Sequence, residues 1–225
     1  MARYKAILLD FYGTLVQEDD PVLETIIQQI GALTPVENAV ADIRRRWWHL
    51  MGQMCLDAHG DNFLTQREIE LRSLQQVLDE FKVDLDPVEL CAPIFRNWQS
   101  PQPYPDAAAF VRALDLPICI VSNIDDDDIK SAIRVNGWSF PMIVTSEGCR
   151  AYKPRPEMFE AALRLLDVGP AEVLHAGDSL GSDVAGAQRC GIDVAWLNRR
   201  SRPLPSIPPT VVALSFVDVL SWIDP

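Results

Sequence analysis

Short apolar runs that stop abruptly at a small or polar residue recur along this chain and constrain its fold more than any other feature. Four such runs lie at residues 6–9, 118–121, 171–176 and 193–197. The first three stop at Asp10, Ser122 and Gly177. Continuous apolar runs of this length are typical of strands that are buried on both faces of a parallel sheet.

Segments with helical periodicity separate these strands. They lie at residues 107–114, 127–136, 156–166 and 183–190. Alternation of strand and helix predicts an α/β fold with a doubly wound parallel sheet. Ligands of such sheets bind outside the carboxyl ends of the strands, so we expect the polar residues that follow the strands to form the site.

Residues 17–98 have a different pattern, with amphipathic stretches and no convincing strand. The stretches lie at residues 22–30, 36–56, 66–81 and 87–98. They predict a helical insertion, or cap, between two core segments at residues 1–16 and 99–225. The proline-rich segment 101–105 is expected to mark the return to the core.

Charge and composition narrow the class of partner. A net charge of −12 over 225 residues argues against binding to nucleic acid, and an anionic substrate would need a local cation. The five cysteines include no C-x-x-C pair, which favours reduced thiols. We find no signal peptide and no stretch of membrane-spanning length, so we predict a cytoplasmic protein without a membrane partner.

Four short motifs occur in order along the chain. They are Asp10-Phe11-Tyr12-Gly13-Thr14-Leu15, Ser122-Asn123, Lys153-Pro154 and Gly177-Asp178-Ser179 followed by Asp183. In this order they resemble the motifs of the haloacid dehalogenase (HAD) superfamily over nearly the whole chain. The resemblance implies a Rossmann-like core with a helical cap inserted after the first motif.

The motif residues are predicted to be catalytic or to bind substrate. Asp10 would act as a nucleophile and form a covalent intermediate. Ser122 and Asn123 could hydrogen-bond a phosphoryl oxygen or a substrate carboxylate, and the turn at Thr14 would bring backbone amides toward the substrate. Lys153 would offset the negative charge of Asp10 and of the substrate.

A metal site is predicted at the carboxyl ends of the strands, where the motif residues are expected to meet. Asp10, Asp178 and Asp183 would repel one another unless a hard cation such as Mg²⁺ were bound. The resemblance implies that Mg²⁺ is held by Asp10, Asp178 and the backbone carbonyl of Tyr12. Asp183 could instead cap a helix and hold the loop.

Tyr12 departs from the pattern of the superfamily's phosphatases, which carry a second Asp at this position. A phenol is a poor base at neutral pH, so the usual acid–base account does not transfer to Tyr12. Tyrosine here resembles the metal-independent 2-haloacid dehalogenases of the superfamily, in which halide leaves without a proton. The retained Asp178 points back to metal and phosphoryl chemistry.

A dehalogenase would also need a cation for the substrate carboxylate and halide. Arg44, Arg45 and Arg46 of the cap are candidates, and Trp47 and Trp48 follow them. The alternative interpretation, which we favour, is a basic helix face with a tryptophan that anchors the cap core.

Three functions therefore stay open at this level. The first is Mg²⁺-dependent hydrolysis of a small anionic phosphomonoester, and the second is metal-independent 2-haloacid dehalogenation. The third is a catalytically weak binding or regulatory protein. The sequence leaves a monomer and a homodimer equally open.

Overall fold

All six strands of the sheet run parallel, in the order β3-β2-β1-β4-β5-β6. The computed structural model describes residues 3–223. The strands are β1 (Ala6–Leu9), β2 (Ile118–Ser122), β3 (Met142–Thr145), β4 (Val173–Gly177), β5 (Asp193–Leu197) and β6 (Val211–Ala213). This arrangement confirms the predicted α/β fold with a doubly wound parallel sheet.

The register of β1 aligns the ends of the three central strands. Leu9 pairs with Ile120 of β2 and with Ala176 of β4. Because parallel strands end at the same edge, the residues that follow β1, β2 and β4 meet there. Alternate side chains of β1 enter two hydrophobic clusters, Ile7 on one face of the sheet and Leu8 on the other.

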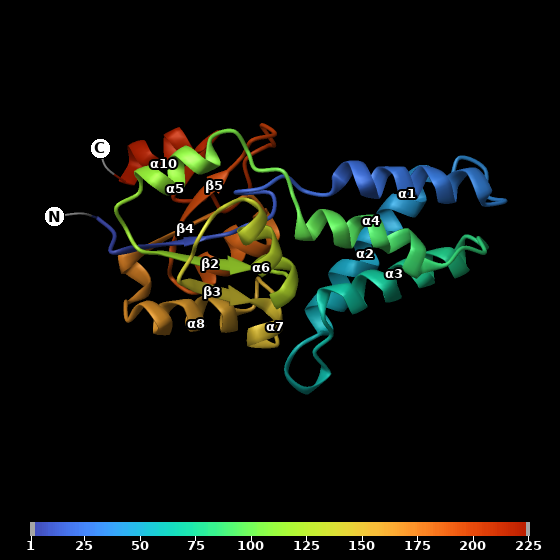
Figure 1. Ribbon diagram of the computed structural model, residues 1–225, viewed down its shortest axis with the longest axis horizontal. Coiled ribbons are helices and arrows are strands. Elements are labelled where there is room, and N and C mark those ends of the chain that lie inside the picture. Colours follow the sequence, from blue (N-terminus) through green and yellow to red (C-terminus); the bar gives the residue numbers. More distant parts are fainter. Residues whose placement is uncertain (1–2, 224–225) are drawn as a thin grey trace.

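Helices cover both faces of the sheet. One face carries α5 (Ala107–Ala113), α6 (Asp126–Val135) and α10 (Phe216–Ile223). The other carries α8 (Pro156–Leu166) and α9 (Ala185–Arg189), and the short α7 (Ser146–Cys149) follows β3. In Figure 1, α5 and α10 lie above the strands and α8 lies below them.

Two core elements differ from the sequence-based expectation. Strand β3 was not predicted, because it is an edge strand of four residues whose first two side chains are only half-buried. The helix expected from residue 183 is shorter, because residues Leu180–Val184 form a π-helical turn before α9 begins at Ala185. Strand β3 and the π-helical turn both depend on tertiary packing, which cannot be predicted from the periodicity of apolar residues.

The chain between β1 and α5 forms a helical insertion. Its helices are α1 (Asp20–Leu33), α2 (Val40–Asp57), α3 (Gln66–Glu80) and α4 (Pro87–Gln99), and α1 packs against α2 and α4. They extend to one side of the sheet in Figure 1, and we call α1–α4 the cap. The domain boundaries at 16/17 and 98/99 stay a prediction. Over residues 3–223 no helix combines the length and the apolarity that a membrane crossing requires.

The cap docks on the core through packing of α4 on α6 and through polar contacts at the start of α3. The carboxylate of Asp125, just before α6, accepts hydrogen bonds from the backbone N–H groups of Gln66 and Arg67 at the start of α3. The guanidinium of Arg67 also pairs with the buried carboxylate of Asp128. A core residue thus satisfies the free N–H groups at the end of a cap helix.

The two tryptophans of α2 have opposite environments. Trp47 is fully buried in the cap, where its Nε1 donates to the hydroxyl of Ser73 at 3.1 Å. The neighbouring Trp48 is exposed. Trp47 therefore anchors the cap core, as the favoured interpretation of this stretch expected.

Candidate active site

A small cavity of about 130 Å³ lies at the carboxyl ends of β1, β2 and β4. Residues from all four motifs line it, together with one residue from the connection to the cap. The lining consists of Asp10, Tyr12, Glu18, Ser122, Asn123, Lys153, Asp178, Ser179, Ser182 and Asp183. The parallel register thus brings together side chains that lie far apart in the sequence.

Lys153 is the buried cation of this cavity. Its Nζ donates to Oδ1 of Asp10 at 2.7 Å, to Oδ1 of Asp183 at 2.7 Å and to the carbonyl of Val121 at 2.8 Å. An ammonium has three donors, so these contacts use all of them. Burial alone would lower the pKa of Lys153, but the charges of Asp10 and Asp183 raise it above its ordinary value. The side chain therefore stays charged.

Asp10 is held at the end of β1 by contacts on both carboxylate oxygens. Lys153 binds Oδ1, and the hydroxyl of Thr14 donates to Oδ2 at 2.9 Å. The backbone N–H of Asp10 donates to the carbonyl of Ala176 in β4. Burial raises the pKa of Asp10, and the charge of Lys153 opposes this shift.

Asp183 holds Lys153 in place and is itself held by two further contacts. Its Oδ1 also lies 2.9 Å from Nε2 of His175, and its Oδ2 accepts the backbone N–H of Ser179 at 2.9 Å. Burial would raise the pKa of Asp183, but the charge of Lys153 and the hydrogen bond to His175 hold it well below its usual range. A side chain on Gly177 would lie 2.4 Å from Cγ of Asp183, so only glycine fits.

His175 was missed by the sequence analysis. It occupies the middle of β4, where its side chain is fully buried. The available signal was a lone histidine in an otherwise apolar strand, a pattern that more often marks a core residue than a site residue. Only the fold places it against Asp183.

Three carboxylates form a group that could hold a metal ion. One oxygen each of Asp10, Asp178 and Asp183 lies within 4.8 Å of the others. Burial and the negative charges of Asp183 and Asp10 raise the pKa of Asp178 to about 8. This mutual repulsion is what a hard cation with oxygen ligands would relieve, so the donor set fits Mg²⁺.

Gly13 lets the first motif approach the carboxylates closely. Its φ is +81°, and a Cβ at this position would lie 2.5 Å from Oδ1 of Asp178. The turn thus needs glycine both for its backbone conformation and for space.

The phenol of Tyr12 is hydrogen-bonded to the cap. Its hydroxyl donates to the carbonyl of Trp98 at 2.6 Å. Burial, followed by the charges of Asp128, Asp19 and Asp10, raises the pKa of Tyr12 far above its ordinary value. The phenol therefore stays protonated, which agrees with the expectation that it is a poor base.

The second motif contributes one residue to the cavity wall and one to the position of Lys153. Ser122 is buried and lines the cavity. The side chain of Asn123 accepts the backbone N–H of Lys153 at 2.7 Å and donates to its carbonyl at 3.1 Å. Asn123 therefore fixes the backbone of Lys153, a contact that the sequence analysis did not anticipate.

The cap arginines proposed for substrate binding lie away from this cavity. Arg44 pairs with Glu24 and Arg45 pairs with Asp42, and all four side chains are exposed. Arg46 is likewise ion-paired, with a carboxylate of α3. None of the three arginines is among the described residues that line the cavity at Asp10. The structure therefore does not bring Arg44 and Arg45 together with the motif residues.

A second cavity of about 320 Å³ adjoins the first and lies between cap and core. Its lining consists of Tyr12, Glu18, Asp19, Leu23, Met51, Cys55, Gln66, Glu70, Trp98, Asn123, Ile124 and Ser182. Tyr12, Glu18, Asn123 and Ser182 belong to both cavities. Part of a substrate that extends beyond the reacting group would occupy this space.

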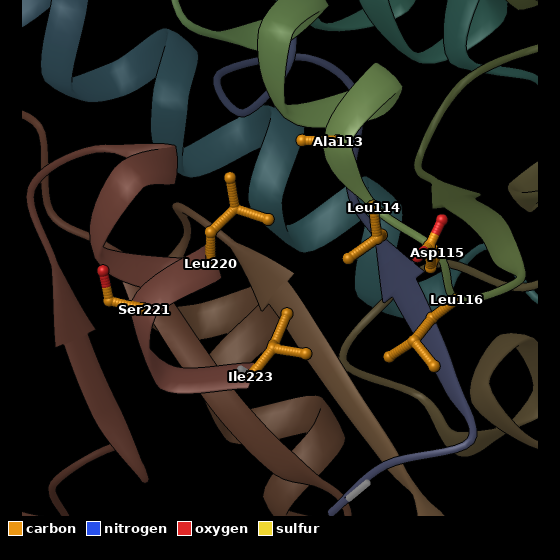
Figure 2. Close-up of a pocket in the computed structure, with 7 residues that line it drawn as sticks. All are labelled: Ala113, Leu114, Asp115, Leu116, Leu220, Ser221 and Ile223. Carbon is orange, nitrogen blue, oxygen red and sulfur yellow. The ribbon is translucent and has the colours of Figure 1, made fainter. Parts of the chain in front are cut away.

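A further cavity, of about 510 Å³, has no motif residue in its lining. Figure 2 shows it between the end of α5 and α10, with Leu114, Leu116, Leu220 and Ile223 around it. Asp115 is the sole ionisable side chain among its described lining residues. Its described lining contains no lysine, arginine, histidine or cysteine.

Both a phosphatase and a dehalogenase are among the known proteins whose sequences resemble this chain. It is 26% identical to the phosphoserine phosphatase of Thermus thermophilus, over 88% of this chain and 90% of that protein. It is 35% identical to an (S)-2-haloacid dehalogenase of Xanthobacter autotrophicus, over 44% of this chain and 40% of that protein.

Solved structures show the same fold. The L-2-haloacid dehalogenase RSc1362 superimposes with a TM-score of 0.81 at 18% identity and covers 99% of both chains. The magnesium-bound HAD-hydrolase YfnB of Bacillus subtilis superimposes with a TM-score of 0.73 at 22% identity, over 99% of this chain and 100% of that one. The family model of haloacid dehalogenase-like hydrolases matches residues 4–191, and the chain belongs to this family of hydrolases.

Proposed function

We propose that the protein is a Mg²⁺-dependent phosphohydrolase that acts on small phosphomonoesters through an aspartyl-phosphate on Asp10. The observation that carries this proposal is the group of three carboxylates formed by Asp10, Asp178 and Asp183. A metal-independent displacement of halide needs no metal ligand at Asp178, whose pKa is raised by burial and by the negative charges of Asp183 and Asp10. Phosphoryl transfer uses such a group to hold a divalent cation.

Asp10 would attack phosphorus, forming an O–P bond while the bond from phosphorus to the leaving oxygen breaks. Lys153 balances the charge of Asp10 during this step. Ser122, which lines the cavity, would donate a hydrogen bond to a phosphoryl oxygen. Water then cleaves the aspartyl-phosphate and regenerates Asp10.

Asp10, Asp178 and the carbonyl of Tyr12 would hold Mg²⁺, with Asp183 completing the acidic group. Bound Mg²⁺ would supply positive charge to the phosphoryl oxygens. The hydrogen bonds of Asp183 to Lys153 and Ser179 keep the surrounding loops in position.

Tyr12 replaces the second aspartate of the superfamily's phosphatases, and this replacement should affect which leaving groups react. The phenol of Tyr12 is committed to the carbonyl of Trp98 and holds its proton tightly. Esters whose leaving group needs no protonation should therefore react fastest. An aryl phosphate is the ester of choice for detecting activity.

Dehalogenation is the competing function, and Tyr12 together with the dehalogenase relatives favours it. Its substrate carboxylate needs a cation. Among the described residues that line the two adjoining cavities, Lys153 is the sole lysine or arginine, and its three donors are already used. This charge pattern favours the phosphohydrolase.

Two assays separate these functions. The protein should hydrolyse p-nitrophenyl phosphate with Mg²⁺ and lose this activity in EDTA, and Asp10→Asn should abolish it. The exposed Asp84→Asn variant serves as the control for the same chemical change. Equal rates with EDTA and Mg²⁺ would refute the proposal. Chloride release from L-2-chloropropionate in EDTA, lost in Asp10→Asn, would establish the dehalogenase instead.

A further inference from the structure

Glu70 of α3 is a buried carboxyl group without a complete set of partners. Its side chain is 2% exposed, and its Oε1 has no hydrogen-bond partner among the residues that the structure describes. Burying a polar group in this way costs free energy unless something compensates it. Such groups are rare in native proteins and call for a specific explanation.

The position of Glu70 explains why its carboxyl group lacks a partner. It lines the cavity between cap and core, which shares Tyr12 and Glu18 with the cavity at Asp10. The docking of Asp125 on the start of α3 fixes this helix against the core. Glu70 therefore faces the space that the leaving group of a substrate bound at Asp10 would enter.

The charge of this cavity selects what can enter. Glu18, Asp19 and Glu70 all line it, and its described lining contains no lysine or arginine. Burial, and next the charge of Asp19, raises the pKa of Glu70 to about 8. Burial also raises the pKa of Asp19, which accepts a hydrogen bond from Nε1 of Trp98 at 2.7 Å. An ammonium bound here would stabilise the ionised forms of Glu70 and Asp19 and lower their pKa values, whereas a second anionic group on the substrate would raise them further.

We infer that Glu70 is the anchor of a subsite for an ammonium group on the leaving-group side of the substrate. The orphan Oε1 would accept a hydrogen bond from the ammonium, and Asp19 would add to the negative potential, whereas Glu18 is already ion-paired with Arg200. The apolar wall of Leu23, Met51 and Ile124 would contact the carbon chain that joins the ammonium to the ester. The substrate class is thus an aminoalkyl phosphomonoester. This inference rests on the proposed phosphohydrolase function and extends it.

Two esters of equal size provide the test. 2-Aminoethyl phosphate and n-propyl phosphate differ in that an ammonium replaces a terminal methyl group. With Mg²⁺ the wild-type protein should favour the aminoethyl ester by about tenfold or more in kcat/KM, the size expected for one charge-assisted hydrogen bond. This ratio tests the inference even if variants at position 70 do not fold.

The variant Glu70→Gln keeps the shape of the side chain and removes the negative charge that Glu70 would carry beside a bound ammonium. It should bring the ratio of the two esters close to one, mainly through a higher KM for 2-aminoethyl phosphate. The variant Glu37→Gln makes the same change at an exposed loop position and should keep the wild-type ratio.

The possible outcomes distinguish the proposed phosphohydrolase function from the proposed ammonium subsite at Glu70. Hydrolysis of p-nitrophenyl phosphate without a preference for the ammonium ester would overturn the subsite and leave the phosphohydrolase intact. A wild-type preference that persists in a folded Glu70→Gln variant would also overturn the role of Glu70. If no ester releases phosphate, p-nitrophenyl phosphate included, the phosphohydrolase and the subsite both fall.

Discussion

Nζ of Lys153 lies 2.7 Å from Oδ1 of Asp10, so the proposed nucleophile and its counter-charge form a buried ion pair. The same Nζ reaches Asp183 at an equal distance. Two anions therefore depend on one cation in a place that water barely reaches. A pair of this kind is strongly destabilised when one partner is removed, because the remaining charge stays buried.

Lys153→Met should therefore damage both stability and activity. We expect a loss of about 3 kcal/mol or more in the free energy of unfolding, and a fall of at least about 100-fold in kcat/KM for p-nitrophenyl phosphate. Urea unfolding and steady-state kinetics measure the two effects. The control is Lys130→Met, which removes an exposed lysine. Wild-type stability in Lys153→Met would contradict the proposed balance of charges.

Gly13→Ala tests the close approach of the first motif to Asp178. The new Cβ would meet a carboxylate oxygen at 2.5 Å, so we expect a higher Mg²⁺ concentration for half-maximal phosphatase activity. Gly137→Ala is the matched control, because its φ is also positive, at +67°, but its Cβ would meet nothing within 4 Å. Both variants share the backbone strain. Equal Mg²⁺ dependence in the two would show that the contact with Asp178 is unimportant.

Arg67→Met tests the docking of the cap on the core. It leaves the buried carboxylate of Asp128 without its partner, and we expect a loss of about 2 kcal/mol in the free energy of unfolding. Arg72→Met removes an exposed ion pair on the same helix and should cost less than about 1 kcal/mol. The double variant Arg67→Met/Asp128→Asn should recover part of the loss. Denaturant titrations of the three proteins decide the matter.

The pH dependence of stability follows from the raised pKa values of Asp178 and Glu70. Each is about 8 in the folded protein, above the ordinary values of 3.8 and 4.5. The folded state then binds more protons than the unfolded state between about pH 5 and pH 8, so the stability contributed by these groups falls as pH rises.

Unfolding experiments in EDTA should therefore show stability decreasing from pH 5 to pH 8. Asp178→Asn and Glu70→Gln should each reduce this slope, while the exposed Asp84→Asn should leave it unchanged. Added Mg²⁺ should stabilise the protein most at the upper end of the range, where Asp178 is ionised. A stability that rises with pH in EDTA would contradict the assigned directions.

The sequence by itself was sufficient for the parallel sheet and for the position of Asp10. A short apolar run is readable as a buried strand, and parallel strands must end at one edge, so Asp10, Ser122 and Asp178 had to meet. The sequence placed Gly13 beside the predicted turn at Thr14 and Gly177 at the end of a predicted strand. The close contacts that require them were not visible.

What only the tertiary structure decided is which way the side chains of the cap and of β4 face. Helical periodicity shows that α2 and α3 have an apolar side, but not what lies opposite a given position. Arg44 and Glu70 are both charged residues of cap helices, yet Arg44 is ion-paired at the surface and Glu70 lies buried in the cavity beside Tyr12. These different environments result from packing between segments that lie far apart in the chain. A local sequence pattern does not show which distant segment packs against a residue.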